Sequence, residues 1–151
     1  MSGPNDKKLR AIIHRVVTGC TQAGVTLTRT KLVKLVFLAD YFYKERFGRT
    51  ISGLSYTYYF YGPYSRTLID IVQSMVPDFI MEKETVLSSG SICYLYLPGP
   101  RPVSNVLEPD EEATIDEIVR EFGRRNLSSI LSKVYELPVM QHAKPLETVL
   151  S

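Results

Sequence analysis

The sequence predicts an α+β fold, a mostly helical domain with a small antiparallel sheet of about three strands, in the order α-α-β-α-β-β-α-α. Three observations lead to this prediction. Apolar residues recur at helical spacing in several segments, an aromatic run with strand composition interrupts them, and two further strand-like runs flank a short turn. A chain of 151 residues suits one domain, so we expect residues 1–151 to form a single unit with flexible ends at 1–5 and 148–151.

Two helices are expected first. One covers about residues 6–22, with an aspartate near its start, where a carboxylate suits the free N–H groups. Its apolar stripe consists of Leu9, Ile12, Ile13, Val16 and Val17. The next helix begins at Thr28 or Thr30, reaches about Phe47 and stops at Gly48. Its sequence LVKLVFLADYFY is apolar nearly all round, so we expect it at the centre of the core.

The run LSYTYYFY, residues 54–61, is aromatic and β-branched and therefore predicts a strand. Because side chains alternate along a strand, both of its faces carry aromatic rings. Gly62 and Pro63 are interpreted as the N-cap and first residue of a third helix over about residues 63–76. Pro77 is expected to end that helix.

The second half of the chain begins with a predicted β-hairpin, in which FIMEKETVL and SICYLYL flank the turn SSG. A connector, PGPRPVSN, follows. EPDEEATIDEIVREFGRR predicts a helix with Pro109 near its start and acidic residues in its first turn. LSSILSKVYEL predicts another helix that ends at Pro138, and VMQHAKPLETVL is expected to add an irregular or helical turn.

The composition, 44% hydrophobic and 23% charged, is that of an ordinary soluble protein. No apolar run approaches the roughly 20 residues of a membrane span, and the N-terminus lacks the apolar core of a signal peptide. Cys20 and Cys93 stand alone among apolar neighbours, so we expect reduced core cysteines and a cytoplasmic protein.

Side chains for catalysis are sparse. The two histidines, His14 and His142, are far apart in the sequence, and neither they nor the two cysteines have the spacing of a zinc site. No GxxxxGK[ST] or GxGxxG phosphate loop is present. The sequence therefore predicts no enzyme, no cofactor and no metal, although a hydrolase around His142 or Cys20 is a remote alternative.

The basic residues are concentrated in the first third. Residues 1–50 hold ten Lys/Arg against three Asp/Glu, a balance of +7 in a chain of net charge +2. Arg29, Lys31 and Lys34 lie early in the second helix, where the helix dipole disfavours cations, which points to an outside partner. The alternative is a structural interpretation, in which these charges lie on a solvated helix face and pair with acidic residues in the last third of the chain.

Two kinds of partner are compatible with these features. The helix and hairpin order also fits a winged helix that binds DNA through these basic residues and Arg66. Against this, the predicted hairpin carries Glu82 and Glu84 and has no basic residue at its tip. A protein partner is favoured by the tyrosines around the Gly-Pro corner, because tyrosine offers a large contact area with few rotatable bonds. The candidates for this exposed platform are Tyr59, Tyr61 and Tyr64.

Several segments together resemble a known family. KLVKLVFLADYFYKERFG, residues 31–48, resembles the KLxKLhFhAD…G helix of the SocA-like antitoxins, also called the Panacea domain, and YTYYFYGPYS resembles its aromatic run closed by YGP. The ending around Tyr135, Pro138 and Lys144 is similar to the family's Pro-containing motif, without its tryptophan. The resemblance covers most of residues 5–147.

The resemblance implies a mostly helical domain with a small sheet and no catalysis. Members of the family neutralise a toxin encoded beside them, by direct binding or, in one case, by delivery to a protease. Carried over by position, the motif residues are Lys31, Lys34, Asp40, Tyr61, Gly62 and Pro63. For Asp40 a structural role is favoured over a catalytic one, with a tyrosine of residues 56–61 or a basic side chain as its partner.

The leading hypothesis is therefore a non-enzymatic protein-binding module of a prokaryotic cytoplasm, with a toxin-like protein as partner. Its contacts are assigned to the basic residues Arg29, Lys31 and Lys34 and to the tyrosine platform. The alternative is a DNA-binding regulator of the winged-helix type.

Overall fold

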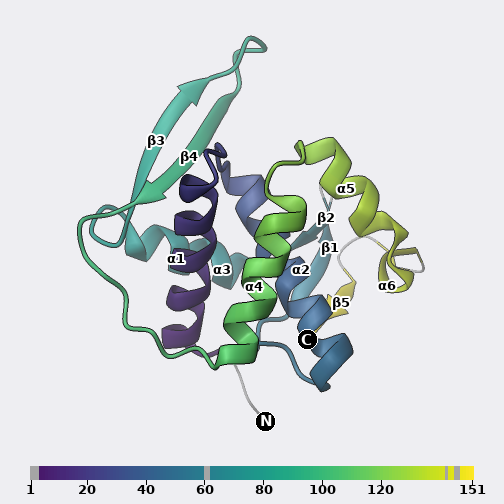
Figure 1. The fold of residues 1–151 in the computed structure, drawn as a ribbon. Coiled ribbons are helices and arrows are strands. Elements are labelled where there is room, and N and C mark those ends of the chain that lie inside the picture. Colours follow the sequence, from purple (N-terminus) through teal and green to yellow (C-terminus); the bar gives the residue numbers. More distant parts are fainter. Residues whose placement is uncertain (1–3, 60–61, 142, 145–146) are drawn as a thin grey trace.

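The computed structural model describes residues 4–59, 62–141, 143–144 and 147–151, and within them the side chain of Tyr59 is not described. It confirms the α+β class, with helices around small antiparallel sheets (Figure 1). The described elements are α1 (Asp6–Gln22), α2 (Arg29–Phe47), β1 (Tyr56–Tyr59), β2 (Gly62–Tyr64), α3 (Arg66–Met75), β3 (Ile80–Val86), β4 (Ile92–Pro98), α4 (Pro109–Phe122), α5 (Leu127–Glu136), α6 (Pro138–Gln141) and β5 (Thr148–Leu150).

Helix α2 forms the centre of the core, as its apolar sequence predicts. Its residues from Leu32 to Tyr41 are all buried, and α1 and α4 pack against it (Figure 1). The Thr28 side chain caps α2 by accepting a hydrogen bond from the Lys31 N–H, and Gly48 ends it with φ +80°. The predicted bounds of α1 and α2 are confirmed, because both helices are delimited by local capping groups.

The strands form two sheets rather than one. Among the strands that the structure describes, β1 lies between β2 and β5, and β3 pairs with β4 alone, all of them antiparallel. The predicted hairpin exists, but it does not join β1. Its base is attached to the chain before α2, where Thr28 bridges Leu95 and the Tyr96 N–H donates to the Leu27 carbonyl at 3.0 Å. From there the hairpin projects beyond the helical body (Figure 1).

The interpretation of Gly62 and Pro63 as a helix start is wrong. Both residues belong to β2, which pairs with β1 through Tyr58↔Pro63 and Tyr59↔Gly62. Helix α3 begins at Arg66, three residues after Pro63, and is capped by Ser65, whose hydroxyl accepts from the Leu68 N–H. A serine hydroxyl caps a helix more effectively than a glycine, which has no side chain to accept a hydrogen bond.

Both chain ends contact other segments, as far as they are described. Asn5 caps α1 with its side chain, and its N–H donates to the Ser52 carbonyl at 3.1 Å. Near the other end, β5 pairs with β1 and buries Val149 and Leu150. The apolar side chains of this segment gain burial only through pairing with a strand nearly a hundred positions earlier, which a local pattern cannot reveal.

Cys20 lies in the core as expected, whereas Cys93, on β4, is only partly buried, and both are free thiols. None of the described helices has the length and apolarity needed to cross a membrane.

Candidate functional site

Four of the residues singled out by sequence, Lys34, Asp40, Gly62 and Pro63, lie where α2 packs against β1 and β2. Asp40, which is 1% exposed, accepts four hydrogen bonds there. Its Oδ1 accepts from the backbone N–H groups of Ile51 and Ser52 at 2.9 and 3.0 Å, and its Oδ2 accepts from the hydroxyls of Ser52 and Tyr56. Burial raises the pKa of the Asp40 carboxyl, and the hydrogen bonds oppose that rise. Of the two partners considered from sequence, the tyrosine is the one found.

Lys34 makes a second connection between α2 and this sheet. The residue is 3% exposed, and its Nζ donates to the Pro63 carbonyl at 2.9 Å. Burial lowers the pKa of this ammonium to about 8, because a low-dielectric environment disfavours the charged form.

Gly62 is required at this junction for two reasons. Its φ of +93° lies in a backbone region that residues other than glycine rarely adopt. A Cβ atom there would also lie 3.1 Å from Lys34 Cε and 3.1 Å from Leu131 Cδ2. Four motif residues, Lys34, Asp40, Gly62 and Pro63, therefore lie at one junction and fix α2 against β1 and β2.

Arg29 connects the start of α2 to the projecting hairpin. Its Nε donates to the Tyr96 hydroxyl at 2.8 Å, and its Nη2 pairs with Glu82 at 3.1 Å. The guanidinium also lies 4.0 Å from the centre of the Tyr94 ring, a cation–π contact. This set of contacts holds the hairpin at its observed angle, a role that the sequence did not suggest for Arg29.

Lys31, the third basic residue of this group, is 8% exposed, and burial lowers its pKa while the Cys20 thiol has a smaller opposing effect. Thus neither Lys31 nor Lys34 presents an ammonium on an open face, and Arg29 is neutralised by Glu82. For the DNA-binding alternative this is unfavourable, since phosphate contacts need accessible cations. Arg66, the remaining candidate, forms an exposed ion pair with Asp70 one turn away on α3.

The tyrosine platform is described only in part. Tyr64 is partly buried on β2, and Tyr59 lies on β1 opposite Gly62. The Tyr59 side chain and the whole of Tyr61 fall outside the described part of the chain. The rings of Tyr58 and Tyr135 lie 6.1 Å apart, so β1 also contacts α5. Whether these tyrosines contact a partner stays a prediction.

A small cavity opens beside this junction. Its volume is about 150 Å³, and its lining residues come from α2, β2 and α3. They are Arg29, Thr30, Val33, Lys34, Gly62, Tyr64 and Ile69. Three of the six residues proposed from sequence as partner contacts thus line one space, two of them carrying cationic side chains.

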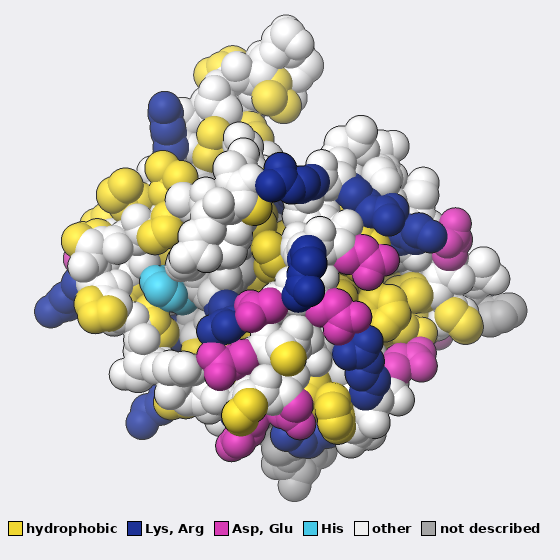
Figure 2. All heavy atoms as spheres, viewed as in Figure 1, with side chains coloured by type: hydrophobic (Ala, Val, Ile, Leu, Met, Phe, Trp, Pro, Cys, Tyr) yellow, Lys and Arg dark blue, Asp and Glu magenta, His cyan; other side chains and the backbone are white. Residues whose placement is uncertain are grey.

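The sequence did not reveal the surface of the hairpin as a candidate site. Of seven large hydrophobic residues exposed in the described part of the chain, five lie on the hairpin: Met81, Val86, Leu87, Ile92 and Leu97. Across the strands Met81 pairs with Leu97 and Val86 with Ile92, so apolar side chains lie opposite one another. Figure 2 shows hydrophobic side chains along the projecting arm. The signal in the sequence was the apolar pair that flanks the turn.

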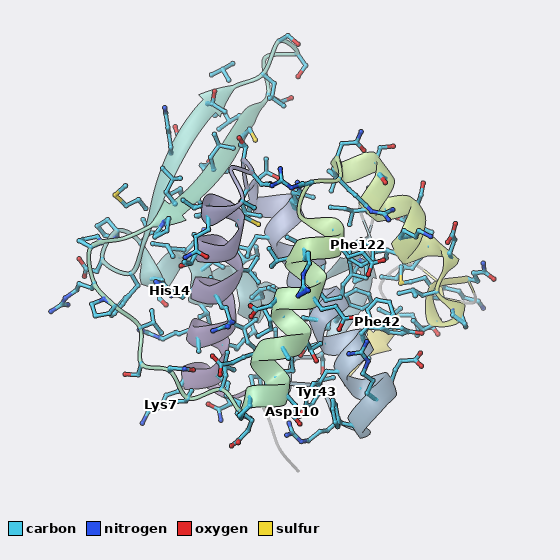
Figure 3. All side chains as sticks on the ribbon, in the orientation of Figure 1. Lys7, His14, Phe42, Tyr43, Asp110 and Phe122 are labelled. Atoms are coloured by element: carbon cyan, nitrogen blue, oxygen red, sulfur yellow. The ribbon has the colours of Figure 1, made fainter. Side chains whose placement is uncertain are left out.

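No catalytic arrangement is evident in the described residues. His14 is half-buried on α1, where burial lowers its pKa, and His142 lies outside the described residues. No group of three or more His, Cys, Asp or Glu able to hold a metal ion occurs in the described ranges. Tyr43 and Asp110 point toward one another from α2 and α4 (Figure 3), and their 3.3 Å hydrogen bond joins the two helices.

A comparison with protein families supplies the remaining finding. The family model described as "Antitoxin SocA-like, Panacea domain" matches residues 32–138. This range contains the junction of α2 with β1 and β2, together with the hairpin. No curated protein matches the chain.

Proposed function

Because the chain belongs to the SocA-like antitoxin family with a Panacea domain, we propose that it is a non-enzymatic module that neutralises a protein toxin by direct binding. The family supports a toxin-like partner, and the geometry supports a binding surface rather than a reaction centre. The buried polar groups of the junction are engaged in holding α2 against the sheet, which is a scaffold role.

The observation that carries the proposal is the apolar hairpin. Val86 and Ile92 are 70% and 57% exposed on an arm that projects from the body (Figure 1). Clustered exposed apolar side chains on a soluble protein mark interaction surfaces, because their burial in a complex is favourable. The occupant proposed for this surface is an apolar face of the toxin, with Arg29 and Glu82 keeping the arm in place.

The tyrosine corner forms the second part of the proposed contact. Tyr59, Tyr61 and Tyr64 remain the proposed contact residues there, since tyrosine is enriched at binding hot spots. Lys34, which donates to the Pro63 carbonyl, and the buried Lys31 are proposed to act on the shape and charge of this contact from the interior.

The test is neutralisation of the protein encoded by the neighbouring gene. We expect that protein to be lethal when produced alone and harmless when produced with this chain, and the two purified proteins to form a complex. The variant Val86→Lys/Ile92→Glu should lose neutralisation and binding while remaining folded, because the new charges are opposite and exposed across the strands.

The matched control is Val106→Lys, which charges an exposed valine, 37% accessible, in the connector before α4. It should neutralise as the unmodified protein does. A folded Val86→Lys/Ile92→Glu variant that still binds and neutralises would refute the hairpin as the contact surface. A neighbouring product that is harmless by itself would refute the antitoxin function.

A further inference from the structure

The buried ammonium of Lys34 lacks a counter-ion. All sixteen Asp and Glu residues of the chain lie in the part that the structure describes, and none of them forms an ion pair with Lys34. Its one acceptor among the described residues is the Pro63 carbonyl, although an ammonium has three N–H donors. Lysines are almost never fully buried unless they are paired, so this one is an exception that calls for a reason.

The cavity of about 150 Å³ lies directly beside this group. Its lining includes a second cation, Arg29, and no acidic residue. Arg29 uses its Nε and Nη2 on Tyr96 and Glu82, which leaves Nη1 without an acceptor in the described part of the chain. The Thr30 hydroxyl adds a further polar group, and Val33 and Ile69 supply apolar walls.

The size and the charge of this space define what it can hold. A partly open space lined by the unpaired Lys34 ammonium and by Arg29, with apolar walls and no acidic residue in its lining, favours a compact anion with a short apolar stem. The side chain of glutamate or aspartate has this form, and a nucleotide is too large for the volume. A carboxylate is also the group that charge-assisted hydrogen bonds from Lys and Arg hold most strongly in proteins, together with phosphate.

We propose that this cavity receives a carboxylate side chain of the protein partner, which pairs with Lys34 Nζ and Arg29. The inference rests on the proposed function, because the toxin is what brings the acidic side chain. The lowered pKa of Lys34, about 8, is consistent with a site whose counter-ion arrives from outside. The pair would be buried on both sides, and this gives the partner's acidic residue a large effect on dissociation rate.

The first experiment needs no partner. The pKa of Lys34 is measured by NMR at its Cε in the full chain, alone and with acetate or glutarate, at constant ionic strength maintained with chloride. A bound carboxylate stabilises the ammonium, so the pKa should rise from about 8 by about 1 unit or more. Acetamide, which is uncharged and of similar shape, should leave it unchanged.

Two variants control for non-specific effects. In Lys34→Met the chemical-shift changes that carboxylates cause around β2 and the start of α2 should disappear. In Lys44→Met, at the other end of α2, they should persist. A Lys34 pKa that does not respond to either carboxylate would overturn the proposal while leaving the antitoxin function to its own test.

Two peptides and the toxin itself are used to identify which molecule supplies the carboxylate. A peptide with one internal glutamate and both ends blocked should raise the Lys34 pKa more than an alanine peptide whose one carboxylate is its C-terminus. Lys34→Met should weaken toxin binding at least tenfold, whereas Lys44→Met should not. If small carboxylates bind but Lys34→Met binds the toxin normally, the partner is not the source and the proposal is wrong.

Discussion

The Tyr56 hydroxyl donates a hydrogen bond of 2.8 Å to Asp40 Oδ2 in the interior of the protein. Tyr56 is 0% exposed, and its ring also makes an edge-to-face contact with Phe37 at 5.1 Å between centroids. The contact joins α2 to β1 across sixteen positions of sequence. Together with Lys34 and Pro63, it makes the two signature segments of the chain parts of one structural unit.

Removing the Tyr56 hydroxyl or the Asp40 carboxylate should destabilise the fold, and the loss of the carboxylate should cost more. Tyr56→Phe deletes one hydrogen bond of the buried carboxylate, and we expect a loss of about 1–2 kcal/mol in the free energy of unfolding. Asp40→Ala leaves two backbone N–H groups and two hydroxyls without their acceptor, so the loss should be about 3 kcal/mol or more. Urea denaturation followed by circular dichroism measures both.

The double variant separates coupling from independent damage. Because Tyr56→Phe removes a donor that Asp40→Ala has already made useless, the double variant should lose clearly less than the sum of the two single losses. Additive losses would show that the Tyr56 hydroxyl contributes nothing through Asp40.

Gly62 offers a test of close approach, with Gly90 as its matched control. Both have left-handed φ values, +93° and +88°, so alanine strains the backbone at either position. At Gly90 nothing lies within 4 Å of the added Cβ, whereas at Gly62 it meets Lys34 Cε and Leu131 Cδ2 at 3.1 Å. Thermal unfolding should therefore show a larger loss for Gly62→Ala, by about 1 kcal/mol or more, than for Gly90→Ala. Equal losses would mean that Lys34 and Leu131 move aside without penalty.

The sequence predicts those features of the fold that depend on residues close together in the chain. The bounds of α1 follow from an apolar periodicity, and those of both α1 and α2 from capping residues within a few positions. The turn between β3 and β4 follows from SSG. The sequence does not predict the strand at Gly62 and Pro63, because a Gly-Pro pair suits a helix start as well as a strand, and the outcome depends on the pairing with β1. The pairing of β5 with β1 is a long-range contact that no local pattern encodes.

The sequence predicts several residues of the candidate site, but not their burial or their contacts. Lysines near a helix start are usually solvated, so nothing in the sequence indicates that Lys34 lies at 3% exposure, in contact with β2. Likewise the hairpin was recognised, but its projection depends on Arg29 meeting Glu82 and Tyr96. The burial of Lys34 and the projection of the hairpin both depend on contacts between elements far apart in the sequence, and composition and residue spacing do not reveal such contacts.

Glu111 should give the protein an acid-sensitive ion pair. Its carboxylate is fully buried on α4 and pairs with Lys8 at 2.6 Å and Arg49 at 3.2 Å. Burial acts to raise the pKa of Glu111, but hydrogen bonds from Lys8, Glu108 N–H and Arg49 outweigh it, and the pKa lies below its ordinary value of 4.5. A carboxyl with a lowered folded pKa stabilises the fold above pH 4.5 and loses that contribution as the pH falls through the folded pKa.

Glu111→Gln should accordingly cost about 2 kcal/mol at pH 7, because it removes the charged acceptor of Lys8 and of the half-exposed Arg49. The difference from the unmodified protein should shrink as the pH falls below 4.5, measured by urea denaturation across the acid range. Glu117→Gln is the control, since its ion pair with Arg46 is exposed and contributes little at any pH. A Glu111→Gln loss that stayed constant from pH 7 to pH 3 would show that packing, not charge, causes it.

Lys34 should lower the stability of the fold at neutral pH, because a lowered folded pKa in a basic group means that the fold disfavours its charged form. Between its folded value of about 8 and its ordinary value of 10.5, the unfolded chain binds the proton that the folded chain has released. The free energy of unfolding attributable to Lys34 therefore rises with pH across that window. At pH 7 the buried charge costs about 3 kcal/mol, the equivalent of the pKa difference.

Lys34→Met removes that cost together with the hydrogen bond to Pro63, so it should stabilise the protein by about 2 kcal/mol at pH 7. The gain should vanish by about pH 10.5. Arg29 and Tyr64 also line the cavity, so the variant is compared with the unmodified protein at each pH. A variant that is less stable at pH 7 would show that the ammonium already has an internal stabiliser, and the cavity would then need no carboxylate from outside.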